Sequence, residues 1–123
     1  MPYYLSVKVN SSYKSIFSIL NLSMANIYFT EITKKDGRSF GVLIGQKFNE
    51  RLNTFIGLII LLTELNDQET LLEILAIGGS LQVINLPQEL GKEAHRLIHL
   101  LKSKNFKLQI CEEIPHMLRE FSD

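Results

Sequence analysis

The chain has 123 residues, of which 46% are hydrophobic and 21% charged, values typical of a globular protein with its own core. Thirteen basic side chains balance thirteen acidic ones, so no net field favours nucleic acid or an anionic membrane as the partner. Cys111 is the single cysteine, which excludes an intrachain disulfide and favours a reducing compartment. The apolar run from Phe55 to Leu62 is too short to span a bilayer, which needs about 20 residues. We therefore predict a single cytoplasmic domain over residues 1–123, without a membrane partner.

The first elements predicted along the chain are a strand and a helix. Residues 3–9 alternate between apolar and polar types, which is typical of a strand with one buried face. Asn10, Ser11 and Ser12 follow and offer N-caps for a helix that begins near Tyr13. The apolar stripe of that helix fades at residues 21–23.

A β-hairpin is predicted next. Residues 25–33 are rich in aromatic and β-branched types, which favour a strand. Residues 34–37 contain Asp-Gly, a strong turn signal, and residues 40–45 supply the partner strand.

The architecture depends on residues 54–79, where two apolar runs flank the polar residues 66–68. The runs fit either a long β-hairpin or two helices, over residues 48–65 and 68–77. Gly57 costs about 1 kcal/mol in a helix interior, and the first run is apolar on both pleat faces, as a covered strand would be. The Leu and Glu residues of the second run favour the helical alternative. We predict the hairpin.

The last third is predicted to hold a strand, a helix, a strand and a short helix. Residues 80–86 read as a strand, and the apolar stripe of residues 88–104 indicates a helix. Asn105 turns the chain into a strand over residues 106–110, and Pro115 opens a terminal helix.

These elements predict an α+β fold in the order β-α-β-β-β-β-β-α-β-α. Its mainly antiparallel sheet would contain about five to six strands and be packed by two main helices. The alternative fold is an α/β layer in which residues 48–65 and 68–77 are helical.

With the hairpin, the chain resembles an uncharacterised bacterial family of small α+β proteins. The resemblance covers roughly residues 3–104 and rests on four stretches: VKVNSSYKSIFSIL, IYFTEIT, FNERLNTFIGLIILLTEL and AIGGS. The family's glycine segment is shortened here to Gly78-Gly79. The resemblance implies a fold and carries no known activity, so it assigns no functional residue.

With the helical alternative, the stretch GGSLQVINLPQELGKEAHRLIHLL looks like the last third of a sulfate-transporter and anti-sigma-antagonist domain. Members of that family bind partner proteins through a loop with a phosphorylatable serine before a helix. The corresponding place here reads Phe55-Ile56-Gly57 and has no serine. This resemblance implies an antagonist-like regulatory protein-binding domain.

Metal binding and catalysis find little support in the sequence. His95 and His99 are four residues apart on the predicted helix, and Cys111 and His116 could complete a metal site. The apolar stripe of the helix is centred elsewhere, however, so we expect both helix histidines to face solvent. No nucleophile, base and orienting group can be assembled from the sequence. We predict no cofactor, no metal and no catalytic residue, and favour a non-enzymatic protein.

Nucleic-acid binding is also disfavoured, although the C-terminal third is rich in lysine and arginine. Lys92 and Arg96 each follow a glutamate, Glu89 and Glu93, at i, i+3 on the same helix. We predict local ion pairs on an ordinary charged helix face.

Aromatic residues are concentrated in the first half of the chain and suggest two kinds of surface. They could line a cavity for a small apolar ligand, made by Phe17, Phe29, Phe55 and Ile59. They could instead form a homodimer face, because both faces of the 55–62 strand need cover. We predict a small interaction module that self-associates, with an apolar-ligand binder and the antagonist-like domain as alternatives.

Overall fold

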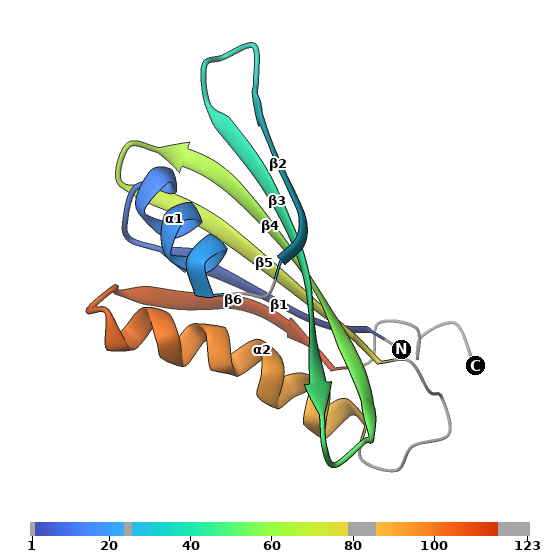
Figure 1. Cartoon of the computed structure of the whole chain (residues 1–123). Helices are drawn as coiled ribbons and strands as arrows, with labels where there is room; N and C mark the ends of the chain where they lie inside the picture. Colours follow the sequence, from blue (N-terminus) through green and yellow to red (C-terminus); the bar gives the residue numbers. More distant parts are fainter. Residues whose placement is uncertain (1, 24–25, 79–85, 116–123) are drawn as a thin grey trace, which may run out of the picture.

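The computed structural model describes residues 2–23, 26–78 and 86–115. Over these residues the chain forms a six-stranded antiparallel sheet and two helices, shown in Figure 1. The elements are β1 (Pro2–Val9), α1 (Tyr13–Ser23), β2 (Asn26–Thr33), β3 (Ser39–Asn49), β4 (Thr54–Asn66), β5 (Glu69–Gly78), α2 (Leu86–Ser103) and β6 (Leu108–Ile114). The predicted α+β fold is confirmed, and so is the order of the predicted elements that lie within these residues.

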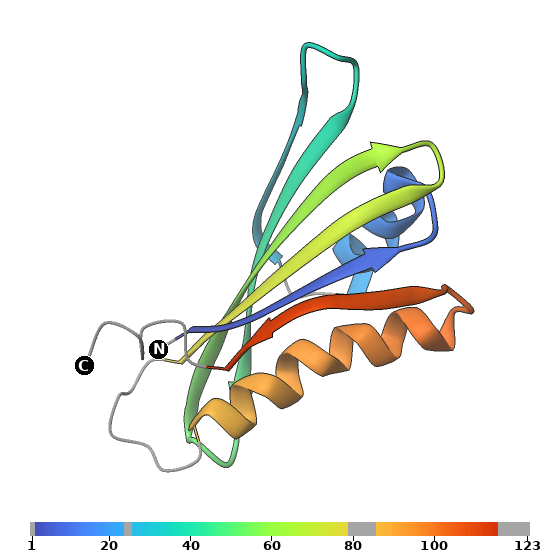
Figure 2. The ribbon, with the colours of Figure 1, turned by 180° about the vertical axis from the view of Figure 1, so that it is seen from behind.

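The strands lie in the order β2-β3-β4-β5-β1-β6, so β2 and β6 are the two edges. Strands β2 to β5 form a meander of hairpins, and β1 enters between β5 and β6. The sheet is strongly twisted, and the tip of the β2–β3 hairpin extends beyond the other strands in Figures 1 and 2.

Both helices pack on one face of the sheet. Helix α1 lies on β3, β4 and β5, and α2 lies along β1 and β5. The core between helices and sheet contains the alternate residues of the central strands and the apolar stripes of the helices; the largest fully buried side chains are Leu5, Ile16, Leu20, Leu43, Ile56, Ile60, Leu62, Leu72, Ile74, Leu90, Ile98 and Leu101.

Residues 54–78, on which the architecture depends, form a β-hairpin as predicted, and the helical alternative is wrong. β4 and β5 pair from Ile56↔Gly78 to Asn66↔Glu69. Asn66 stabilises the turn, because its Oδ1 accepts the backbone N–H of Gln68 at 2.8 Å and its Nδ2 donates to Glu69 at 2.8 Å. Local hydrogen bonds of this kind favour turns over continued helix.

The predicted caps and turns are also present. The Ser12 hydroxyl accepts the backbone N–H of Ser15 at the start of α1. Gly37 closes the β2–β3 turn with a φ of 85°, a conformation that glycine adopts without steric cost. Asn105 ends α2 with a φ of 69° and starts the return towards β6.

The last strand differs from its prediction. We predicted residues 106–110 from the alternation of Phe106, Leu108 and Ile110, whereas β6 runs from Leu108 to Ile114. A register shift opposite Ser6 and Val7 leaves Cys111 without a partner in β1 and lets pairing continue to Ile114. Apart from Leu86, the strand predicted at 80–86 lies outside the described residues, and so does the helix predicted beyond Pro115.

Gly41 in β3 lies directly beneath side chains of helix α1, which leads to a prediction about stability. A Cβ at this position would lie 2.2 Å from the Tyr13 hydroxyl and 2.9 Å from a ring carbon of Phe17. We expect Gly41→Ala to lower the free energy of unfolding by about 1–3 kcal/mol, because the helix must shift to make room. Chemical denaturation measures this change.

Gly57→Ala is the matched control, since its Cβ would meet only Ile77 O, at 3.8 Å, on the opposite face of the sheet. We expect it to keep or slightly raise stability, by about 0.5 kcal/mol. Equal losses for the two variants would contradict the packing of α1 on Gly41.

Candidate functional site

The face of the sheet opposite the helices is the most distinctive surface of the chain. Side chains alternate between the two faces along each strand. In β4, every second residue from Ile56 to Leu62 lies in the core, so Phe55, Ile59 and Leu61 lie on the opposite face. Cross-strand pairing places further apolar side chains beside them; this open face comprises Tyr4, Tyr28, Ile32, Phe40, Val42, Ile44, Phe48, Phe55, Ile59, Leu61, Leu71, Leu75 and Ile77.

Several of these side chains are unusually exposed for their size. Tyr28 and Ile32 are 54% and 56% exposed, Phe48 and Phe55 are 46% and 52% exposed, and Ile77 is 38% exposed. Phe48 and Phe55 are directly opposite each other in β3 and β4, with ring centroids 5.3 Å apart in an edge-on arrangement. Contiguous apolar surface of this extent marks an interaction site more often than ordinary solvent-facing surface.

Charge is restricted to one side of the open face. Among the described residues, β2, β3 and β4 present no charged side chain there. The charged residues lie on β1, β5 and β6, where Lys8 pairs with Glu69 at 3.7 Å. The Tyr4 hydroxyl donates to Glu73 at 2.6 Å, and burial followed by this contact raises the pKa of Tyr4 to about 12. The larger part of the face is therefore apolar and uncharged.

The four residues predicted to line one ligand cavity lie on two faces of the sheet. Phe17 of α1 and Phe29 of β2 lie together on the helix side, with ring centroids 6.2 Å apart. Phe55 and Ile59 of β4 lie on the open face, so the sheet separates them from the first pair. Phe17 and Phe29 border a shallow groove beside α1, and binding of an apolar ligand there stays a prediction.

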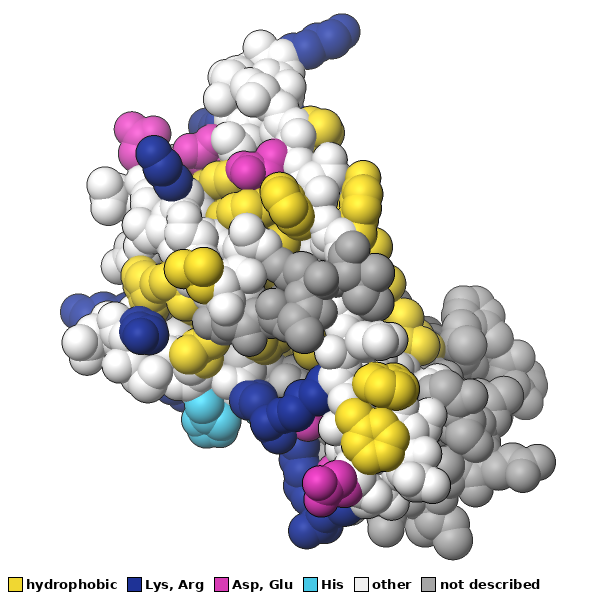
Figure 3. Space-filling model, viewed as in Figure 1, with side chains coloured by type: hydrophobic (Ala, Val, Ile, Leu, Met, Phe, Trp, Pro, Cys, Tyr) yellow, Lys and Arg dark blue, Asp and Glu magenta, His cyan; other side chains and the backbone are white. Residues whose placement is uncertain are grey.

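A charged cluster joins the β3–β4 hairpin to the first half of α2, where Figure 3 shows lysine and arginine side chains gathered. Glu89 and Glu93, one helical turn apart, are only 7% and 4% exposed. The predicted i, i+3 pairs are present, since Lys92 lies 3.4 Å from Glu89 and Arg96 lies 3.0 Å from Glu93.

The hairpin supplies further partners for the same two carboxylates. Lys47 Nζ lies 3.6 Å from Glu93, Arg51 lies 3.7 Å from Glu89, and the Asn49 side-chain amide donates to Glu89 at 3.3 Å. The sequence indicated the helix pairs but not their burial. The sequence feature that points to this burial is the position of Glu93, which lies four residues before Leu97 and therefore at the border of the apolar stripe of the helix. These ion pairs and the hydrogen bond join the β3–β4 hairpin to α2, and we call the cluster the clamp.

Burial makes Glu93 a pH-dependent element of this clamp. One of its carboxylate oxygens is inaccessible and has no hydrogen-bond donor among the described residues. Burial, and then the charge of Glu89, raises the pKa of Glu93 above its ordinary value of 4.5. A carboxyl group with a raised folded-state pKa contributes stability below its unfolded pKa and loses it as pH rises through the folded value.

We therefore expect Glu93→Gln to gain stability relative to the unsubstituted chain as pH rises from about 4.5 to neutrality, because the variant avoids ionisation of a buried group. Urea unfolding at a series of pH values measures the difference. A relative loss of stability towards neutral pH would show that the ion pairs with Lys47 and Arg96 outweigh the cost of burial.

The two described histidines and the cysteine, which the sequence offered as metal ligands, do not come together in the described part of the chain. His95 was expected to face solvent but is half-buried, because β6 extends beneath it, and its Nε2 lies 2.6 Å from Glu113. Tyr3 donates a hydrogen bond to the same carboxylate. Burial, followed by the charges of His99 and Lys102, lowers the pKa of His95 below its ordinary value.

His99 and Cys111 are exposed and take no part in this contact, and His116 lies outside the described residues. Within residues 2–23, 26–78 and 86–115, no three His, Cys, Asp or Glu side chains converge where they could hold a metal ion.

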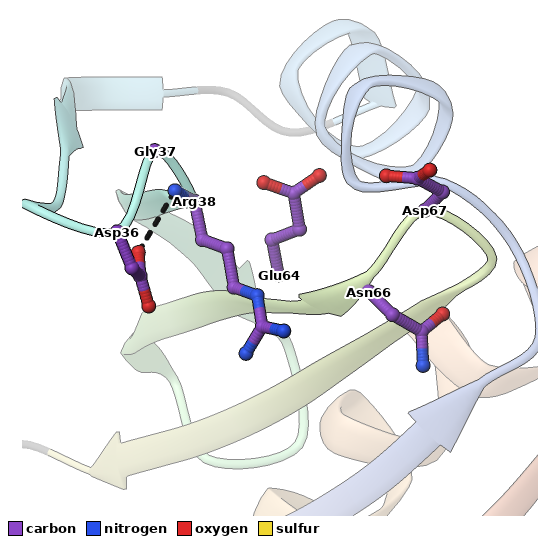
Figure 4. A pocket seen from close by; sticks show the side chains of 6 residues that line it. All are labelled: Asp36, Gly37, Arg38, Glu64, Asn66 and Asp67. Carbon is purple, nitrogen blue, oxygen red and sulfur yellow. Dashed lines mark hydrogen bonds between the residues drawn. The ribbon is translucent and has the colours of Figure 1, made fainter.

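An acidic pocket lies between the β2–β3 and β4–β5 turns, as Figure 4 shows. Its carboxylates serve the turns themselves. Asp36 accepts the backbone N–H of Arg38 at 2.9 Å, and Glu64 accepts the backbone N–H of Ser39 at 2.8 Å. Asp67 points into the same space from the neighbouring turn. We assign this pocket a structural role in fixing the hairpin ends.

Comparison with known proteins adds no further assignment. Neither a protein-family model nor a curated protein sequence matches the chain, so neither family resemblance gains support. In the described part of the chain, no helix combines the length and the apolar character needed to cross a membrane. The open face is thus the candidate functional site, because its exposed aromatic and aliphatic side chains pack against neither helix.

Proposed function

We propose that the protein is a non-enzymatic interaction module that self-associates through the open face of its sheet. One observation carries the proposal: β2, β3 and β4 present an uncharged apolar surface on which neither helix packs. Half-exposed aromatic side chains such as Phe48 and Phe55 gain free energy when a partner covers them, at roughly 25 cal/mol per Å² of apolar area.

The size of the open face is adequate for a stable interface. Strands β2, β3, β4, β5 and β1 all contribute to it. Five strands about 4.8 Å apart, with about eight residues of about 3.4 Å each, give a flat footprint of roughly 650 Å². Side-chain relief raises the accessible area above this value, towards the about 800 Å² per partner of a typical specific interface.

A second copy of the chain is the occupant that best fits the chemistry of this surface. In a two-fold dimer each patch meets itself, so a patch with charge of one sign would repel its copy. The β2–β4 part of the open face avoids this conflict because it is uncharged, and on the other side Lys8 pairs with Glu69. Two sheets packed face to face at about 10 Å would form a sandwich whose second core is made by these side chains.

We also propose a cytoplasmic location, which the chemistry of the thiol supports. Cys111 is free and exposed on β6, and a reducing compartment keeps such a thiol from forming disulfides between chains.

The test of self-association is a charge placed at the centre of the aromatic pair. We expect light scattering to give a mass of at least two chains at micromolar concentration, and Phe55→Glu to halve it, because the interface would bury an unpaired carboxylate. The side chain is 52% exposed, so the folded protomer should tolerate the change.

Leu22→Glu is the matched control, since Leu22 is 87% exposed on α1 and lies away from the open face. It should leave the mass unchanged. A monomeric unsubstituted chain would overturn the proposal, and so would equal masses for the unsubstituted chain and Phe55→Glu.

A further inference from the structure

The edge strand β2 has exposed apolar side chains on both faces of the sheet. In Figures 1 and 2 it is the outermost strand on its side of the sheet. Tyr28 and Ile32 are 54% and 56% exposed on the open face, and Phe29 is 53% exposed on the opposite, helix-bearing face. A partner that covered only the open face would leave Phe29 uncovered. A partner strand beside β2 would pack against both faces.

The other edge, β6, shows how this sheet protects a strand against pairing. Strand β6 has a bulge at Cys111 and the charged residue Glu112 next to it, whereas Glu113 is bound by Tyr3 and His95 of the same chain. Bulges and charged side chains are the usual devices that keep edge strands from pairing with other chains. From Tyr28 to Thr33, β2 pairs regularly with β3 and contains one charged residue, Glu31, whose carboxylate accepts a hydrogen bond from the Tyr13 hydroxyl on its own chain.

We infer that β2 pairs antiparallel with β2 of a second copy, in a register centred on Thr30, and so joins two sheets edge to edge. This proposal uses a different surface from the open face but rests on the same general function, self-association. In an antiparallel pair, residues directly opposite each other point to the same face of the sheet. When the two strands are copies related by a two-fold axis, this condition holds only if the axis passes through one residue that is paired with its own copy.

The centre on Thr30 follows from the side chains of β2. It places Tyr28 opposite Ile32 of the second copy, twice by symmetry, so the most exposed apolar residues of the open face cover each other. It also pairs Thr30 with itself, a favourable cross-strand pair. A register centred on Glu31 would set two carboxylates opposite each other, and one centred on Phe29 would place Tyr28 opposite Thr30.

Edge pairing and face packing are compatible in one assembly. The two-fold axis of the strand pair is perpendicular to the sheet, and the axis of a face-to-face dimer is parallel to it. If these axes intersect, the two contacts close into a four-chain particle with three mutually perpendicular two-fold axes. Loss of either contact would then leave a two-chain species, which keeps the two proposals separately testable.

Disulfide trapping tests the register directly. In a Cys111→Ser background, Thr30→Cys would place two thiols on directly opposed residues, with Cα atoms about 4.5–5.5 Å apart, within the range of a disulfide. We expect mild oxidation to give a covalent two-chain product as the main species. Ile32→Cys in the same background is the matched control, because four residues of offset separate its two copies by about 14 Å. It should remain uncross-linked.

The same experiment distinguishes the edge from the face. Thr30→Cys combined with Phe55→Glu should still cross-link, because the edge pair does not depend on the open face. Cross-linking at Phe29→Cys in place of Thr30→Cys would overturn the register. Equal yields for Thr30→Cys and Ile32→Cys would overturn the edge pairing itself, and so would the absence of any product. None of these results would affect the expected effect of Phe55→Glu on the mass.

Discussion

The pairing of β4 with β5 is the constraint on which the rest of this structure depends. Its register places Ile60 opposite Ile74 in the core and, by alternation, Ile59 opposite Leu75 on the open face. A shift of one residue would exchange the two faces of one strand relative to the other. Because β4 is apolar on both faces and the two helices pack on one of them, the same register that builds the core also creates an uncovered apolar surface. Core and candidate interface are therefore two sides of one pairing.

The second organising contact is polar. Glu89 and Glu93 of α2 are buried against the β3–β4 hairpin and hold Lys47 and Arg51 close to the helix. Such pairs contribute little net stability, since desolvation opposes the Coulombic attraction. The clamp fixes the end of the sheet that bears Phe48 and Phe55. The helix face of the sheet thus orients the aromatic pair on its other face.

Part of the candidate site could be predicted from the sequence. The excess of aromatic residues in the first half, and the two-sided apolar character of residues 55–62, indicated either a ligand cavity or an association face. Phe17 and Phe29 meet, but Phe55 and Ile59 lie across the sheet from them, because strand alternation separates residues that look equivalent in composition. Local sequence patterns did not reveal two further features, because each involves elements far apart in the chain. These are the burial of Glu89 and Glu93 and the contact between His95 and Glu113.

By itself, the sequence determined the order of the elements that lie within the described residues, because these depend on local preferences: alternation in β1, the Ser12 cap, the Asp-Gly turn and the glycine within β4. For residues 54–79 it favoured a hairpin over two helices through Gly57 and the apolar character of both faces of the first run, and the turn hydrogen bonds of Asn66 became visible only in the structure. Only the tertiary structure decided which face the helices cover, which strands become edges and how exposed Phe55 remains. Those outcomes depend on packing between elements that are far apart in the chain. Helix α1 lies over Gly41 and α2 lies along β1, so neither helix covers the opposite face of the sheet.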